Sequence, residues 1–237
     1  MRNFFLSLKL NTKLTYIIIG VNVVIWLITE IAGGSTNSLV LLRFGALYRD
    51  LVIHGEIWRM VSAAFLHIGI LHLLVNSYTL YQLGTFIENF FGQKKLIATY
   101  VLTAITASFF SLIFTGGISA GASGALFGLT GLLLGNGWAK KTYVLDLPID
   151  ERQLIPFVLY NLWFGMMSPG IDNWAHIGGL LGGIALGFMF DPITSFDPSK
   201  IKQILPNILG KLSILILAVT AIFWVLSIWG INLVFSY

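Results

Sequence analysis

The sequence predicts an all-α membrane protein that crosses the bilayer seven times. Hydrophobic residues make up 57% of the 237 residues and charged residues only 10%, which is far more apolar than a soluble domain. Apolar runs long enough to cross a hydrocarbon core of about 30 Å recur along the chain. The expected helices are Tyr16–Ile31, Val61–Leu80, Leu96–Phe114, Ala122–Trp138, Leu154–Met167, Trp174–Phe190 and Leu212–Val234.

The first run follows a basic segment, Arg2 to Lys13, so a signal peptide is the alternative interpretation. The run is long and no small-residue cleavage site closes it, which favours an uncleaved first helix. The last run is nearly pure Leu, Ile, Val, Phe and Trp and is expected to face lipid. Runs that carry Ser, His, Asn and Gly are expected to build a site.

The positions of the Lys and Arg residues predict the orientation. If the N-terminus is cytoplasmic, only Arg43, Arg49 and Arg59 of the 14 basic residues fall outside, all in the first outer segment. The opposite orientation would place most positive charge outside. The net charge of +4 therefore indicates topology rather than nucleic-acid binding. The basic inner segments are residues 1–14, 83–95, 139–153 and 191–211.

Three polar side chains of the second run, His67, His72 and Asn76, are candidates for a role in a site. His72 and Asn76 are four residues apart and share a helix face, where interhelical hydrogen bonding is the alternative to a role in chemistry. His67 lies about 140° away round the same helix, and a satisfied polar contact near the outer surface is the better interpretation for it.

The fourth and sixth runs begin with a nucleophile and a base. Ser123 lies between Ala122 and Gly124 in a turn with Gly121, and His176 follows Trp174-Ala175. One descent, one inner loop and one ascent separate the two residues, so they return to a similar depth. A serine hydroxyl needs a base to accept its proton, and histidine is the usual base near neutral pH.

Small residues on both runs favour close packing of the two helices. One stripe is Gly124, Gly128, Gly131 and Gly135, and Gly179 and Gly183 lie on the face of His176. Two such faces in contact would bring Ser123 within hydrogen-bonding distance of His176. A purely structural packing motif is the alternative.

The combined motifs resemble those of the rhomboid intramembrane serine proteases, over roughly residues 15–190 and in the family's order. The matching segments are Gly55-Glu56-Ile57-Trp58-Arg59, His67, His72, Asn76, Glu88-Asn89-Phe90-Phe91-Gly92, Gly121-Ala122-Ser123-Gly124-Ala125-Leu126-Phe127-Gly128, Ala175-His176-Ile177-Gly178-Gly179 and Gly183.

The resemblance implies a six-helix rhomboid-like transmembrane bundle over 15–192, preceded by a cytoplasmic segment over 1–14. A cytoplasmic linker and an additional seventh transmembrane helix follow over 193–237. It implies Ser123 as nucleophile and His176 as general base. It also implies an oxyanion hole formed by His72, Asn76 and the Ser123 backbone amide, and a structural role for Trp58-Arg59.

Two residues near the site need separate interpretation. Phe127 stands where the family often has tyrosine, and its ring can still stack on His176 without the hydroxyl. Asp172 lies four residues before His176; capping of the sixth helix by Asp172 or Asn173 is favoured over contact with the imidazole.

The predicted function is an intramembrane serine endopeptidase with a Ser-His dyad, no cofactor and no metal, acting on transmembrane proteins within membrane lipid. Absent cysteines exclude disulfides and thiol catalysis, and no His-Glu-x-x-His pair or intramembrane aspartates are present. A transporter and a non-cleaving helix-binding chaperone are the alternatives. The protein is expected in a cell membrane, with its C-terminus and active-site opening outside. The compact chain suggests a bacterial source.

Overall fold

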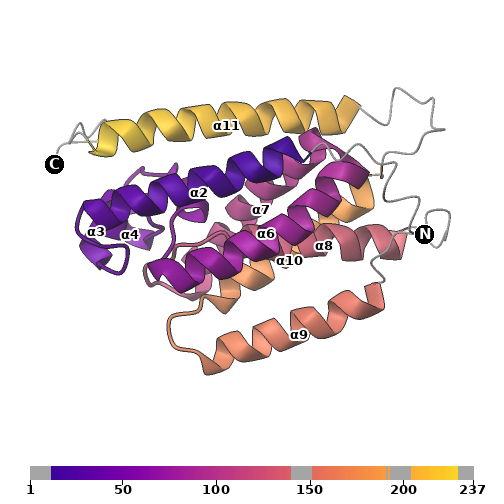
Figure 1. The fold of residues 1–237 in the computed structure, drawn as a ribbon, viewed down its shortest axis with the longest axis horizontal. Helices are drawn as coiled ribbons and strands as arrows, with labels where there is room; N and C mark the ends of the chain where they lie inside the picture. Colours follow the sequence, from indigo (N-terminus) through magenta and orange to yellow (C-terminus); the bar gives the residue numbers. More distant parts are fainter. Residues whose placement is uncertain (1–11, 140–150, 191, 193–203, 229–237) are drawn as a thin grey trace.

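The computed structural model describes residues 12–139, 151–190, 192 and 204–228, and every regular element in these ranges is a helix (Figure 1). The all-α class is therefore confirmed. The long helices are α2 (Lys13–Ile31), α6 (Gly69–Phe91), α7 (Gln93–Phe114), α8 (Ser123–Ala139), α9 (Glu151–Met167), α10 (Asn173–Met189) and α11 (Ile204–Ile228). The short ones are α3 (Ser38–Arg43), α4 (Arg49–Ile53), α5 (Arg59–Ser62) and the 3-10 helix η1 (Ala63–Phe65).

Three helices, α2, α7 and α11, are long and apolar enough to cross a membrane. The pair α5–η1 and α6 makes a fourth if it is counted as one broken span. Helices α8 and α10 have 17 residues each, or about 26 Å, slightly less than the hydrocarbon core. The chain is a membrane protein, and the count of seven spans stays a prediction.

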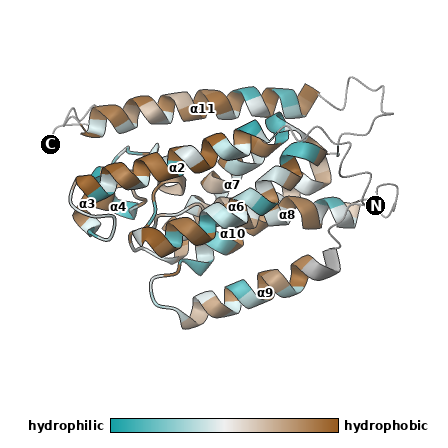
Figure 2. Cartoon of the chain, in the orientation of Figure 1, coloured by the Kyte–Doolittle hydropathy of each residue, from teal (hydrophilic) through white to brown (hydrophobic). Residues whose placement is uncertain are grey.

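Helix α8 forms the centre of the bundle. Most of its residues are buried, and it packs against α7 and α10. Helices α9 and α11 lie on opposite sides of this centre (Figure 1). Their surfaces, like that of α2, are largely apolar (Figure 2), as expected of helices that face lipid. Near the N-terminal end of α11, Asn207 accepts a hydrogen bond of 2.8 Å from the Lys94 ammonium of α7.

The glycine faces of α8 and α10 meet as the sequence predicts. A Cβ placed on Gly179 would lie 1.9 Å from the carbonyl oxygen of Gly124, and one on Gly183 would lie 2.0 Å from that of Gly128. In the other direction, a Cβ on Gly131 would lie 2.3 Å from the Leu180 oxygen. The two backbones are therefore in direct contact, which no residue other than glycine would permit at these positions.

The predicted second helix, Val61–Leu80, is wrong in its extent. Residues 59–65 form the short helices α5 and η1, and these are bent by 93° from α6, which begins at Gly69. Gly69, the first residue of α6, has φ +76°, a conformation that glycine adopts readily and that lets the chain change direction there. At its other end α6 continues to Phe91, so only Gly92 separates it from α7 and the predicted inner segment 83–95 is mostly helical.

The predicted last helix also differs from α11, which starts eight residues earlier, at Ile204, and includes Lys211. A lysine near the end of a membrane helix can extend its ammonium group toward the membrane–water interface. The charge of Lys211 therefore did not mark the start of the last helix. Residues 1–11, 140–150, 191, 193–203 and 229–237, which include the end of the predicted last helix, lie outside the described residues.

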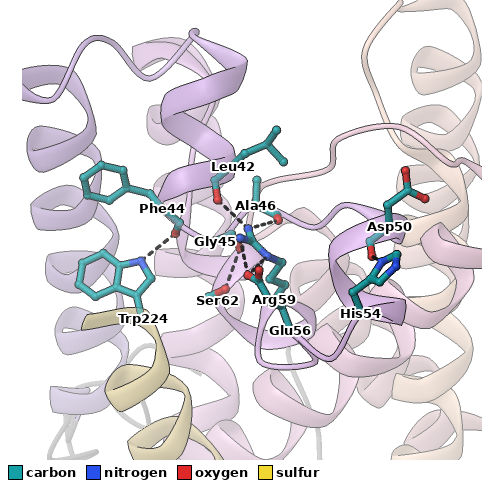
Figure 3. A network of polar contacts seen from close by, with 10 residues as sticks. All are labelled: Leu42, Phe44, Gly45, Ala46, Asp50, His54, Glu56, Arg59, Ser62 and Trp224. Carbon is teal, nitrogen blue, oxygen red and sulfur yellow. Dashed lines mark hydrogen bonds and ion pairs between the residues drawn. The ribbon is translucent and has the colours of Figure 1, made fainter. Parts of the chain in front are cut away.

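The segment between α2 and α6 folds around the buried Arg59. Its guanidinium donates to the backbone oxygens of Leu42 (2.6 Å) and Ala46 (3.0 Å) and pairs with the Glu56 carboxylate at 2.6 Å (Figure 3). The adjacent Trp58 packs against Gly45, where a Cβ would lie 2.4 Å from the indole. These contacts fit the structural role expected for Trp58-Arg59.

Candidate active site

Ser123 and His176 face each other at the ends of α8 and α10. Ser123 is the first residue of α8, and His176 lies in the first turn of α10. The imidazole Nε2 and the serine Oγ are 2.9 Å apart, a hydrogen-bonding distance. Gly124 directly follows the serine, and Gly179 lies about one helical turn after the histidine. The backbone contact between these two glycines keeps the two side chains at this distance.

The imidazole of His176 is oriented by stacking. The Phe127 ring lies parallel to it, with centroids 4.3 Å apart and an interplanar angle of 13°. His176 is 7% exposed, and its Nδ1 has no hydrogen-bond partner in the described part of the chain. Among the described residues, therefore, no carboxylate lies within hydrogen-bonding distance of this nitrogen.

Asp172 caps α10 and does not contact the imidazole by a hydrogen bond. Its Oδ1 accepts the Ala175 amide (3.0 Å) and the Thr115 hydroxyl (2.7 Å), and its Oδ2 accepts the Ser111 hydroxyl (2.5 Å). Both oxygens are occupied by donors from α10 and from the C-terminal end of α7. The capping interpretation is therefore confirmed, and the cap also ties the two helices together.

The turn before Ser123 requires glycine. Gly121 has φ +139°, and its N–H donates to the Ala63 oxygen at 2.9 Å. A Cβ on Gly121 would lie 2.6 Å from Cε1 and 2.8 Å from Nε2 of His72. The absence of a side chain at Gly121 thus permits the His72 imidazole to lie against the turn that precedes Ser123.

His72 and Asn76 bring side-chain donors to this turn from α6. The Ile68 amide donates to Nδ1 of His72 at 3.4 Å, which leaves Nε2 as the protonated nitrogen of the neutral ring, beside Gly121. The Asn76 amide nitrogen is buried and has no partner among the described residues. The backbone amide of Ser123 adds a third donor, because the first N–H groups of a helix have no acceptor within the helix.

The expectation for His67 is wrong. The residue lies in the link between η1 and α6 rather than on the helix face opposite His72, and it is completely buried. Its ring is edge-on to that of His72, with the ring centroids 5.3 Å apart. Neither ring nitrogen of His67 has a hydrogen-bond partner in the described ranges. The positive φ of Gly69 produces this placement, which helical spacing could not predict.

A cavity of about 560 Å³ opens beside the pair. His72 and Asn76 line this cavity, and so do residues of α9 and of the connection between α9 and α10. Within the described residues no group of three or more His, Cys, Asp or Glu side chains could hold a metal ion. The wall from α9 and the connection consists of Phe157, Asn161, Phe164, Pro169, Gly170, Ile171 and Asp172.

Comparison with known proteins identifies relatives over this region. The family model described as "Rhomboid domain" matches residues 54–192. "Rhomboid protease GluP" of Bacillus subtilis is 39% identical over 169 residues, which are 71% of this chain and 33% of that protein. "RHOMBOID-like protein 1" of Arabidopsis thaliana is 37% identical over 65% of this chain and 40% of its own length.

A third relative, "Rhomboid-like protease 2" of Toxoplasma gondii, is 30% identical over 76% of this chain and 66% of its own length. The chain spans well under two thirds of the length of the first two relatives. The family match over 54–192 includes all the site residues described above.

Proposed function

This chain belongs to the rhomboid family, and from that premise we propose that it is a serine endopeptidase that hydrolyses peptide bonds in or near transmembrane segments of membrane proteins. The observation that carries the proposal is the 2.9 Å contact between the Ser123 hydroxyl and the His176 imidazole. The contact lies beside a cavity lined by Asn76, whose amide nitrogen has no hydrogen-bond partner among the described residues.

In the first step, the Ser123 oxygen attacks the scissile carbonyl carbon while Nε2 of His176 takes the hydroxyl proton. The carbonyl oxygen becomes negatively charged in the tetrahedral intermediate. It accepts hydrogen bonds from Nε2–H of His72, the Asn76 amide and the Ser123 backbone N–H. Each such donor is worth roughly 3 kcal/mol in known cases.

Collapse of the intermediate breaks the C–N bond, and His176 gives its proton to the leaving amine. A water molecule then attacks the acyl-serine ester, again with His176 as base, and releases the acid and free Ser123. No carboxylate takes part, since Asp172 is engaged by α7 and the α10 backbone.

Substrate access is proposed through the α9 side of the cavity. Helix α9 packs on α8 and α10, and the connection 168–172 covers the cavity beside it. The Pro169-Gly170 turn in this connection gives it the character of a mobile cap, and outward movement of α9 would admit a transmembrane segment. Glycine and alanine around Ser123 leave a confined space, which favours a small residue before the cut and a segment that unwinds easily.

The proposal includes the location of the reaction. The distribution of Lys and Arg supports a cytoplasmic N-terminus, so that the cavity would open toward the outer side, from which water enters.

Reconstitution in liposomes with a fluorescent transmembrane substrate and a fluorophosphonate probe tests this function. Ser123→Ala and His176→Ala are each expected to abolish cleavage and labelling while the protein still folds and inserts. Ser119→Ala is the matched control, because this serine lines the same cavity without a described hydrogen bond to a histidine. Near-normal turnover by either variant would contradict the dyad, and an unlabelled wild type would favour a transporter or a non-cleaving binder.

A further inference from the structure

The C-terminal end of helix α11 is joined by hydrogen bonds to the segment between α2 and α6. The Trp224 indole N–H donates to the backbone oxygen of Phe44 at 2.7 Å, and the two rings meet edge to face with centroids 6.0 Å apart (Figure 3). The Arg43 guanidinium donates to the oxygen of Ile228 at 3.2 Å, at the helix end where a positive charge is favourable. The outward surface of α11 is apolar, so these contacts are distinct from its lipid-facing role.

Phe44 belongs to a turn whose other carbonyl groups are held from a different side. We refer to residues 42–46 as the outer turn. Arg59 of α5 binds the oxygens of Leu42 and Ala46, and Ser62 donates to the oxygen of Gly45 at 2.7 Å. The outer turn is therefore fixed by α5 on one side and by Trp224 of α11 on the other.

The outer turn leads directly to the active site. Leu47, the next residue, exchanges two backbone hydrogen bonds of 2.9 Å with Ser119. Two residues later Gly121 donates to Ala63 and lies against His72. The side chains before Gly121 pack in the same apolar cluster as Phe44 and Trp224; they are Ile118 and Ala120.

We propose that α11 braces the active site and that Trp224 is a positioning residue for the turn that precedes Ser123. The proposal rests on the protease function proposed above. Loss of the indole N–H leaves the Phe44 oxygen without its donor, and the outer turn then relaxes together with the Leu47–Ser119 pair. The position of Gly121 relative to His72 changes as a result, which weakens stabilisation of the transition state. The alternative is that Trp224 only anchors α11.

The turnover of Trp224→Phe, which keeps an aromatic ring but loses the donor, distinguishes these roles. Trp138→Phe is the matched control, because Trp138 is 46% exposed at the end of α8 and its indole has no partner in the described part of the structure. Active sites are first counted by fluorophosphonate titration, so that misfolded protein does not lower the measured kcat. Hydrogen exchange of the amides of residues 118–121 is followed in parallel.

For Trp224→Phe we expect kcat per titrated site to fall about three- to tenfold, which corresponds to one lost positioning hydrogen bond. KM is expected to stay unchanged, because none of the affected groups lies on the α9 wall of the cavity. Exchange at 118–121 is expected to accelerate, and Trp138→Phe to match the wild type. Arg43→Gln, an exposed change that preserves the fold, is expected to shift both readouts in the same direction by about twofold.

Wild-type kcat per titrated site together with unchanged exchange in Trp224→Phe would overturn the proposal and leave α11 as an anchored lipid-facing helix. A wild type that neither cleaves nor is labelled at Ser123 would instead refute the protease function. In that case the exchange comparison still decides whether α11 braces the turn.

Discussion

Substitution of Gly179 by alanine should separate Ser123 from His176, the pair proposed to be catalytic. The new Cβ would lie 1.9 Å from the Gly124 oxygen, whereas real Cβ contacts below 3.0 Å are essentially never observed. The facing atom is backbone, so no side chain can rotate away and the two helices must move apart by about 1.1 Å. If that shift reaches the ends of the helices, the 2.9 Å contact between Ser123 and His176 lengthens to about 4 Å, beyond hydrogen-bonding distance.

The expected effect is a loss of about 100-fold in kcat, the size associated with a 1 Å misplacement of reacting groups. Overpacking is also expected to lower the free energy of unfolding by roughly 1–3 kcal/mol. The rate of fluorophosphonate labelling reports on the pair without requiring substrate access through α9. Cleavage of a transmembrane substrate and thermal unfolding in detergent complete the assay.

Gly20→Ala is the matched control for this experiment. Gly20 lies exposed on α2 with no atom within 4 Å of its Cβ position, so the change should leave activity intact and slightly favour the helix. If Gly179→Ala is labelled and cleaves within threefold of the wild type, direct backbone contact between α8 and α10 does not set the geometry of the pair.

Three further predictions concern residues around the cavity. His72→Ala and Asn76→Ala should each lower kcat by about ten- to a thousandfold without abolishing it, because the Ser123 amide remains; unchanged steady-state rates for both would return them to a structural role. Asp172→Asn should keep kcat within tenfold of the wild type, because asparagine also caps helix N-termini and a residue that only caps α10 needs no charge. A thousandfold loss in the pH-independent kcat would instead indicate that Asp172 completes a Ser-His-Asp triad. Cysteines introduced at Val75 of α6 and Phe157 of α9, which both line the cavity, should block cleavage when a thiol-specific cross-linker with a reducible spacer joins them, and reduction should restore cleavage; full activity of the completely cross-linked protein would exclude access through α9.

The sequence predicts the parts of the site that depend on local pattern. Glycine spacing indicated which faces of the fourth and sixth helices meet, and the observed contacts of Gly179 and Gly183 agree with it. The same reasoning brought Ser123 and His176 to one depth. Asp172 was interpreted correctly because an N-cap is a local feature, with its acceptor three residues before the Ala175 amide.

Other features depend on contacts distant in sequence and could not be predicted. The bend before α6 follows helix α5, whose Arg59 binds backbone oxygens of Leu42 and Ala46, 17 and 13 residues earlier. Continuous apolar character across the bend suggested a single helix, which misplaced His67. The link from Trp224 to Phe44 spans 180 residues, and nothing in the composition of the last helix distinguishes this tryptophan from its lipid-facing neighbours.

Because no carboxylate of the described residues binds Nδ1 of His176, the orientation of the imidazole depends on packing. One imidazole nitrogen faces Ser123 and the other has no partner in the described part of the chain, so hydrogen bonds alone leave the ring free to tilt. The parallel Phe127 ring limits this tilt. The Asp172 cap joins the start of α10 to α7 and thereby limits movement of His176 along the axis of α10. Because these constraints act on the ring face and the helix backbone, a change in the spacing of α8 and α10 should affect the reaction more than the loss of a charge near His176.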